Sequence, residues 1–317
     1  MTFDPIQTLP DAPAGYARAA KLLQTGKLVA FPTETVYGLG ADARNDTAVA
    51  RIFEAKGRPS FNPLIVHFVD ADAVKQHVLW SEQAERLANA FWPGPLTLVL
   101  PKCGGSNISR LVTAGLDSLA VRMPAHPTAR ALLSVFDGPV AAPSANRSGQ
   151  ISPTQAGHVV NSLESRVDAV LDGGACEVGV ESTIIGLVDK PVLLRPGGVT
   201  AEAISEVLGG PIAERKNADV ISAPGQLSSH YAPNAGVRLN ATEWRDGEAR
   251  LGFGDVECDL NLSPHEDLVE AAARLFDYLH QLDAGDATTI AVSPIPHHGL
   301  GVAINDRLSR AAAPRQG

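Results

Sequence analysis

Apolar and polar positions repeat along this chain with the periods of helices and strands. Apolar residues that recur three and four positions apart mark the buried face of a helix, whereas short apolar runs bounded by glycine or proline are typical of strands. We expect helices at residues 12–25, 47–56, 81–92, 127–136, 154–163 and 200–208. We expect strands at residues 28–31, 63–69, 96–100, 119–123, 140–142, 167–171, 183–188 and 192–194.

Several of the expected strands follow one another without a helix between them. This order favours one twisted mixed sheet with helices packed on it over a strictly alternating parallel sheet. The fold class is therefore expected to be α/β with a mixed, α+β character. We assign the sheet to a large first domain of residues 1–210.

The pattern changes after residue 210. Residues 211–236 show no periodicity and are rich in proline and glycine, so we interpret them as a linker that runs over the surface. A smaller α/β domain of residues 237–317 is expected to follow. It has strands near residues 250–253 and 289–292, a leucine-striped helix between them and a last helix at about 301–312.

Composition limits the classes of function. The 317 residues carry 26 Lys and Arg against 35 Asp and Glu, a net charge of −9, which argues against bulk binding to nucleic acid but leaves room for a small basic pocket. Three cysteines without a CxxC spacing argue against a zinc site or a disulfide framework. The N-terminal segment has neither a basic region nor a long apolar run, so we expect a cytoplasmic protein without a membrane segment.

Two cations stand where the helix at 47–56 ends. Lys56 continues the apolar face of that helix, Gly57 and Pro59 end it, and Arg58 lies between them. A lysine in the last helical turn often does no more than complement the helix dipole. Two cations on one half-buried corner also suit an anionic ligand, and both interpretations remain open at this point.

Two polar side chains interrupt apolar strands. Arg122 breaks the run at 119–123, and a buried cation requires an anionic partner. That partner is either a carboxylate of this chain or a ligand. His67 lies inside the apolar run at 63–69, where a histidine is either a hydrogen-bonded core residue or part of a site.

Polar loops follow several of the expected strands. The loop at 143–153 is rich in hydroxyl and amide groups that suit a phosphate or a ribose, although such loops are often simple turns. Residues 38–43 match the GxGxxA dinucleotide fingerprint, but the preceding strand ends too early and no suitably spaced acidic residue follows. No Walker, GxSxG or HExxH motif is present.

Ordered motifs cover nearly the whole chain. PTETVYGLGA, AKGRP with NPLIVH, WPGPLT, LAVRMPAHP, APSAN, GVESTII and LLRPG resemble the YrdC-like family. The continuation through SHYAP to NDRLSR is similar to the two-domain form of that family, the threonylcarbamoyl-AMP synthases. The resemblance implies a large YrdC-like domain with a twisted mixed sheet, followed by a small Rossmann-like domain.

The resemblance also implies a reaction. A nucleotidyltransferase of this family converts ATP, L-threonine and bicarbonate into threonylcarbamoyl-AMP and pyrophosphate, for the threonylcarbamoyladenosine modification of tRNA. It implies Mg²⁺ carried by ATP, with no metal ligand from protein side chains. The expected partner is a downstream tRNA threonylcarbamoyltransferase, and direct binding of tRNA is expected to be weak or absent.

The family motifs place functional residues in this sequence. Lys56 and Arg58 are expected to be catalytic, and together with Ser144 and Asn146 they form the family signature. The residues implied for ATP are Arg58, Asn62, Ser118, Ser144, Asn146, Ser152, Arg195 and Tyr231. The resemblance implies that the linker at 211–236 acts as a lid and that its Tyr231 closes over the nucleotide. The residues implied for threonine or its carbamate are Thr33, Thr35, His67, Arg122, Ala142 and Ser182.

One departure from the family pattern and two alternatives accompany this interpretation. Ser228 and Ser229 stand where relatives often carry a basic residue, which weakens the case for phosphate binding by the linker. The first alternative is carbamoyl transfer to another acceptor, as in the hydrogenase-maturation carbamoyltransferases. The second is an RNA-binding protein, which the acidic balance disfavours.

Overall fold

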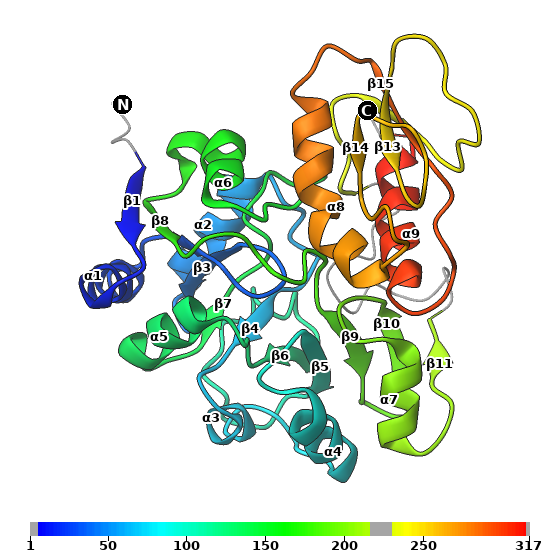
Figure 1. The fold of residues 1–317 in the computed structure, drawn as a ribbon. Helices are drawn as coiled ribbons and strands as arrows, with labels where there is room; N and C mark the ends of the chain where they lie inside the picture. Colours follow the sequence, from blue (N-terminus) through cyan, green and yellow to red (C-terminus); the bar gives the residue numbers. More distant parts are fainter. Residues whose placement is uncertain (1–5, 216–229, 315–317) are drawn as a thin grey trace.

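The computed structural model describes residues 6–215 and 230–314, which form two sheets with helices packed on them (Figure 1). Within these residues the larger sheet has eleven strands and the smaller one has four. The expected mixed α/β fold is confirmed. Of the expected linker, residues 216–229 lie outside the described part of the chain.

The larger sheet contains most of the strands. In spatial order they are β1 (Gln7–Pro10), β8 (Ala169–Asp172), β2 (Val29–Phe31), β3 (Gly38–Asp42), β7 (Val140–Ala141), β4 (Ile65–His67), β6 (Ser118–Arg122), β5 (Leu96–Pro101), β9 (Thr183–Gly186), β10 (Val192–Arg195) and β11 (Ala213–Glu214). The sheet contains parallel pairs such as β4–β6 and β5–β9 and antiparallel pairs such as β2–β3 and β5–β6. The sheet is therefore mixed.

Helices cover both faces of this sheet. They are α1 (Pro13–Gln24), α2 (Asp46–Lys56), α3 (Ala71–Lys75), α4 (Glu82–Phe91), α5 (Pro127–Phe136), α6 (Ala156–Leu163) with the short 3₁₀ helix η1 (Glu164–Arg166), and α7 (Ala201–Leu208). Val29 and Phe31 of β2 share a core with α1 and α5, whereas Ala30 faces the core built by α2, α4, α6 and α7. Successive strand residues therefore serve opposite layers.

The smaller sheet belongs to the C-terminal part of the chain. Its strands are β12 (Gly236–Arg238), β15 (Thr289–Val292), β13 (Glu248–Gly252) and β14 (Leu260–Asn261), and every pair is parallel. It shares one apolar core with α8 (Leu268–Asp283) and α9 (Leu300–Ala312). We name residues 236–312 the C-terminal unit. Figure 1 shows it beside the β9–β10 end of the large sheet.

Sequence patterning located the long elements well. The helix expected at 127–136 and the strand expected at 289–292 have the predicted bounds. Residues 38–42, expected as a loop with a weak dinucleotide fingerprint, form strand β3 instead. A Cβ added to Gly40 would lie 2.8 Å from the Phe31 ring, so this glycine permits close strand packing and not ligand approach.

No helix of the described chain is long and apolar enough to cross a membrane.

Candidate active site

A small cavity lies where loops at the strand ends of the large sheet meet residues 230 and 231. Its volume is about 40 Å³, which is room for a few water molecules. The lining residues are Thr33, Thr35, Val36, Gly38, Arg58, Ile65, His67, Arg122, Ala142, Pro143, Ser144, Glu181, Ser182, Arg195, His230 and Tyr231.

The cavity gathers most of the residues that the sequence singled out. All residues expected to contact threonine line it: Thr33, Thr35, His67, Arg122, Ala142 and Ser182. Of the residues expected to contact ATP, four line it: Arg58, Ser144, Arg195 and Tyr231. The remaining candidates lie outside this lining: Lys56, Asn62, Ser118, Asn146 and Ser152. Residues far apart in sequence therefore meet at one place.

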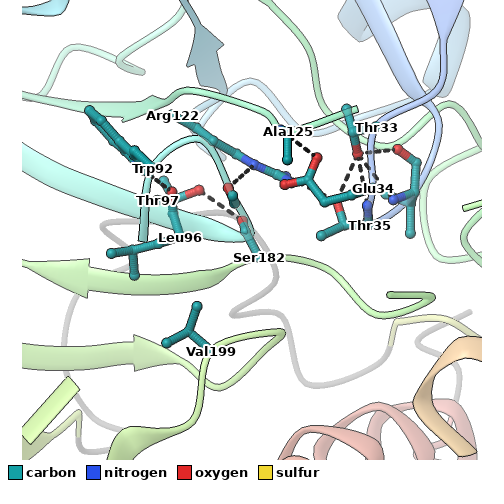
Figure 2. A network of polar contacts seen from close by, with 12 residues as sticks. Thr33, Glu34, Thr35, Trp92, Leu96, Thr97, Arg122, Ala125, Ser182 and Val199 are labelled. Carbon is teal, nitrogen blue, oxygen red and sulfur yellow. Dashed lines mark hydrogen bonds and ion pairs between the residues drawn. The ribbon is translucent and has the colours of Figure 1, made fainter. Parts of the chain in front are cut away.

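Arg122, at the end of β6, makes side-chain hydrogen bonds to three different residues. Its Nη2 donates to Glu34 Oε1 at 2.7 Å and its Nη1 donates to Thr35 Oγ1 at 3.0 Å (Figure 2). Its Nε donates to the carbonyl of Gly94 at 3.3 Å. The second oxygen of Glu34 accepts from the backbone N–H of Ala125 at 3.0 Å. The guanidinium is therefore held rigidly on three sides.

Glu34 answers a question that the sequence left open. Of the two kinds of partner considered for Arg122, a carboxylate of this chain or a ligand, the structure shows the first. Burial by itself raises the pKa of the Glu34 carboxyl, but the charge of Arg122 and the hydrogen bonds outweigh it and lower that pKa. Both side chains are almost fully buried, so the pair is charged inside the protein.

A short hydrogen-bond chain extends from Arg122 through two threonines. The hydroxyl of Thr33 donates to the carbonyl of Val36 at 2.7 Å. Its single proton is thereby used, so in the 2.8 Å contact between the two hydroxyls Thr35 is the donor (Figure 2). Because Thr35 also accepts from Arg122, both of its polar contacts are fixed, and its hydroxyl keeps one position in the cavity wall.

His67 ends β4 and lies against the edge of the Phe31 ring, with 6.1 Å between ring centroids. Burial, helped by the nearby charge of Arg122, lowers the pKa of His67 to about 3. Within the described structure its Nδ1 has no hydrogen-bond partner. The imidazole is therefore neutral and retains one nitrogen for a ligand.

Lys56 is buried at the last position of α2. Gly57 caps this helix in the left-handed conformation, with φ of 59°. The ammonium group donates to the carbonyl of Ser144 at 2.5 Å and also to the carbonyl of Asn146. Burial lowers the pKa of Lys56 well below its usual range, and the nearby charge of Arg58 lowers it further. Lys56 thus ties the end of α2 to the backbone of the loop that carries Ser144 and Asn146.

Arg58 and Arg195 bring two further buried guanidinium groups to the cavity. Arg58 donates to the carbonyls of Asn62 and Pro63 at 3.3 and 2.9 Å. Arg195 donates to the carbonyl of Ser182 at 3.1 and 2.8 Å, and to its hydroxyl at 3.2 Å. Burial lowers the pKa of Arg58 to about 10. Tyr231 acts in the opposite direction and raises this pKa, whereas the charge of Arg195 lowers it further.

Two amides outside the lining have unused polar atoms. Asn62 is buried, and neither polar atom of its side chain has a hydrogen-bond partner among the described residues. Asn146 donates to the carbonyls of Arg147 and Gln150, while its Oδ1 has no partner in the same part of the chain. An unpaired buried amide is costly, so both positions are suited to a ligand.

Two predicted nucleotide residues occupy other positions. The hydroxyl of Ser152 donates to Glu181 Oε1 at 2.6 Å and does not face the cavity directly. Ser118 is the first residue of β6, whereas Arg122 is the last. Four residue steps along the strand place their Cα atoms ~13 Å apart. A role of Ser118 on ATP stays a prediction that requires the nucleotide to extend beyond the cavity.

The segment after the undescribed residues closes one side of the cavity. Tyr231 is 1% exposed and His230 is 6% exposed, and their rings stack with centroids 4.1 Å apart. Tyr231 has a φ of 63°, an unusual value for a residue with a side chain. Its ring is therefore held in the cavity wall by packing that outweighs local strain.

Sequence reasoning missed three charged residues of this region and one histidine. Glu34 and Glu181 stand inside the PTET and GVEST motifs, but roles were assigned only to the hydroxyl residues of these motifs and not to the two carboxylates. Arg307 stands in NDRLSR, and its Nε donates to Glu181 Oε2 at 2.8 Å across 126 residues of sequence. His230 precedes Tyr231. The available signal was that each polar motif contains one carboxylate, which could have been considered as the partner of a buried arginine.

No group of three or more His, Cys, Asp or Glu side chains in residues 6–215 and 230–314 is placed to hold a metal ion.

Comparisons with known proteins divide the chain into two matched regions. Residues 21–197 match the family model described as "Telomere recombination" (Sua5, YciO and YrdC), and residues 199–313 match "Threonylcarbamoyl-AMP synthase, C-terminal domain". The threonylcarbamoyl-AMP synthase of Pyrococcus abyssi is 42% identical over 322 residues, which cover 94% of each chain. That of Bacillus subtilis is 43% identical over 325 residues, with 94% of this chain and 93% of the relative covered.

Solved structures agree with the two matched regions. The crystal structure of P. abyssi Sua5 complexed with L-threonine superposes with a TM-score of 0.89 at 40% identity and covers 98% of both chains. Full-length HypF covers 59% of this chain at 23% identity with a TM-score of 0.53, which shows a shared fold alone. On the family models and on identities above 40% over almost the full length, the chain belongs to the threonylcarbamoyl-AMP synthase family in its two-domain Sua5 form.

Proposed function

We propose that this chain synthesises threonylcarbamoyl-AMP from ATP, L-threonine and bicarbonate. In this reaction the threonine amine and bicarbonate form a carbamate, the carbamate oxygen attacks the α-phosphorus of ATP, and pyrophosphate leaves. The protein does not need to provide a covalent nucleophile, because alignment of the reactants and stabilisation of phosphate charge suffice.

One observation carries the nucleotide half of the proposal. Lys56, Arg58 and Arg195 are buried, and within the described structure their hydrogen bonds go to carbonyl and hydroxyl oxygens and not to carboxylates. Buried cations without an anionic partner are strongly disfavoured. A polyphosphate would supply the missing negative charge, and the free polar atoms of Asn62 and Asn146 would complete its surroundings.

The threonine half rests on Arg122 and its neighbours. A guanidinium has five N–H donors, and the three hydrogen bonds that Arg122 makes within the described structure leave two donors for a carboxylate. Thr35, Ser182 and neutral His67 line the same wall and provide hydroxyl and imidazole groups for a small polar amino acid. The Arg122–Glu34 pair also offers both signs of charge, which matches a zwitterion.

The metal in this proposal is Mg²⁺, which proteins commonly bind together with the phosphates of a nucleotide. Mg²⁺ would arrive with the phosphates of ATP and neutralise part of their charge, while Lys56, Arg58 and Arg195 neutralise the remainder. In this arrangement Ser144 would lie beside the nucleotide, and Ala142 would lie beside the threonine methyl group.

The cellular role follows from the product. Threonylcarbamoyl-AMP is an activated acyl adenylate, so a downstream tRNA threonylcarbamoyltransferase would consume it in the cytoplasm. With a net charge of −9, we do not expect this chain to hold tRNA by bulk electrostatics.

The test is ATP-dependent release of pyrophosphate with and without each co-substrate. The proposal requires that release depends on both threonine and bicarbonate. Equal release without threonine would contradict it, and release that requires carbamoyl phosphate would favour carbamoyl transfer to another acceptor. Salt-sensitive binding of tRNA without any pyrophosphate release would favour an RNA-binding protein.

A further inference from the structure

Arg307 joins the C-terminal unit to the cavity. It lies on α9, and 0% of its surface is exposed. Its Nε donates to Glu181 Oε2 at 2.8 Å, and its Nη1 donates to the carbonyl of Pro196 at 2.8 Å. Its Nη1 also donates to Asp306 at 2.8 Å, and its Cζ lies 5.4 Å from the centroid of the Tyr231 ring. Two of these partners, Glu181 and Tyr231, line the cavity.

Glu181 is a carboxylate among cations. Its other oxygen accepts from Ser152 at 2.6 Å, and Arg195 lies close enough to influence its charge. Burial by itself raises the pKa of Glu181, but the charges of Arg307 and Arg195 outweigh burial and lower it. Glu181 is therefore ionised beside the place that we assign to the phosphates.

An ionised carboxylate at that place requires compensation. A polyphosphate would be repelled by Glu181 unless a cation of the protein neutralised it. Arg195 and Arg58 are the cations assigned to the nucleotide itself, so they are not free for this purpose. Arg307 pairs with the Glu181 oxygen that Ser152 does not occupy, and among the cavity residues it contacts the Tyr231 ring as well.

We propose that Arg307 is a positioning residue for the nucleotide: it holds Glu181 and Tyr231 in place and cancels the carboxylate charge next to the phosphates. This inference rests on the proposed function, because it assigns the phosphates of ATP to the side of the cavity lined by Arg58 and Arg195. It also gives the C-terminal unit a part in the reaction, since α9 of that unit supplies the cation that pairs with Glu181.

The test is the kinetic behaviour of Arg307→Met. We expect KM for ATP to rise about tenfold, with kcat and KM for threonine within about twofold of wild type, because lost charge compensation acts on phosphate binding. Adding Glu181→Gln to this variant removes the uncompensated charge, so the double variant is expected to recover most of the lost affinity for ATP.

Arg274 provides a matched control. It lies in the same unit on α8 and makes the same three kinds of contact: an ion pair with Glu270 at 2.7 Å, a bond to the carbonyl of Leu262 at 3.4 Å and a ring contact with Tyr278 at 5.9 Å. None of these partners lines the cavity. Arg274→Met should therefore leave both KM values unchanged.

Two failures can be told apart. If wild type shows no pyrophosphate release that depends on threonine and bicarbonate, the proposed function fails. If wild type is active and Arg307→Met has the same KM for ATP as the control Arg274→Met, the role proposed for Arg307 is wrong, while the proposed function stands. A parallel rise in both KM values that Glu181→Gln does not reverse would also overturn it. Should Arg307→Met not fold, Arg307→Lys is measured instead, and we expect a KM for ATP above wild type, because lysine keeps the charge but loses the guanidinium fork.

Discussion

Arg122 and Glu34 form an ion pair in the wall of the cavity, with 2.7 Å between Nη2 and Oε1 (Figure 2). They lie 88 residues apart in sequence, and their side chains are 4% and 7% exposed. Such a pair is sensitive to the loss of either member, because the remaining charge stays buried without a partner.

We therefore expect Glu34→Gln to lower the free energy of unfolding by about 3 kcal/mol, since Arg122 would lose its carboxylate partner. Urea denaturation at pH 7 measures this change. Asp72→Asn is the matched control, because Asp72 contacts Lys75 at 3.8 Å with 93% of its side chain exposed. An equal effect of the two substitutions would contradict a stabilising buried pair.

The contribution of Glu34 should depend on pH with a defined sign. Its pKa is lower in the folded protein than its ordinary value of 4.5, so the unfolded chain takes up the proton first as the pH falls. The difference in unfolding free energy between wild type and Glu34→Gln should be constant above pH about 5 and shrink below pH about 4. A difference that grows on acidification would show the opposite sign of coupling.

His67 is expected to remain neutral throughout the working range of pH. Its pKa of about 3 lies far below the ordinary value of 6.5, because burial and the charge of Arg122 disfavour the imidazolium. Nitrogen NMR shifts of the His67 ring, assigned by comparison with His67→Gln, should show no titration between pH 8 and pH 5. A midpoint near 6.5 would show that the ring is solvated. Because the unfolded chain is protonated first, this residue also lowers stability as the pH falls from 6.5 towards 3.

The two signature cations should matter for turnover. We expect Lys56→Ala and Arg58→Ala each to lower pyrophosphate release about 10²-fold or more, as the loss of charge stabilisation does. Lys27→Ala is a suitable control, since Lys27 is half exposed and pairs with Asp168 at 3.4 Å. Turnover at the wild-type rate in either signature variant would refute the assigned roles.

Gly57 fixes the direction in which the chain leaves α2 towards Arg58. Its φ of 59° is unfavourable for a residue with a Cβ, although no atom lies within 4 Å of an added Cβ. Gly57→Ala should therefore cost about 1 kcal/mol of stability through backbone conformation alone. Gly157→Ala, in the helix α6 with equally open surroundings, should instead stabilise. Thermal unfolding of both variants tests this, and a loss of stability for both would contradict it.

Local patterning predicted the elements whose signals are local. The helix at 127–136 begins with Pro127, and its buried residues recur with helical spacing, so its bounds could be read from the sequence. Strand β3 could not be recognised, because its glycines indicate a turn. Gly40 is needed because a Cβ at this position would lie 2.8 Å from Phe31 and 3.1 Å from Val140, which belong to the two neighbouring strands.

The candidate site divides in the same way. Lys56 and Arg58 stood out because a helical stripe and a Gly-Pro stop surround them in sequence. The partners of Arg122 and Glu181 could not be deduced, since each ion pair joins segments about a hundred residues apart. The odd polarity of Arg122 in an apolar strand predicted that a partner exists, while the fold alone determined that this partner is Glu34.

The central claim is that the residues around this cavity bring a threonine carbamate to the α-phosphate of ATP. The most direct measurement is mass spectrometry of the adenylate formed from ATP, threonine and ¹³C-labelled bicarbonate. The account predicts a threonylcarbamoyl-AMP that carries one heavy carbon and disappears when threonine is omitted. An unlabelled adenylate, or formation of AMP and pyrophosphate without any acyl adenylate, would contradict it.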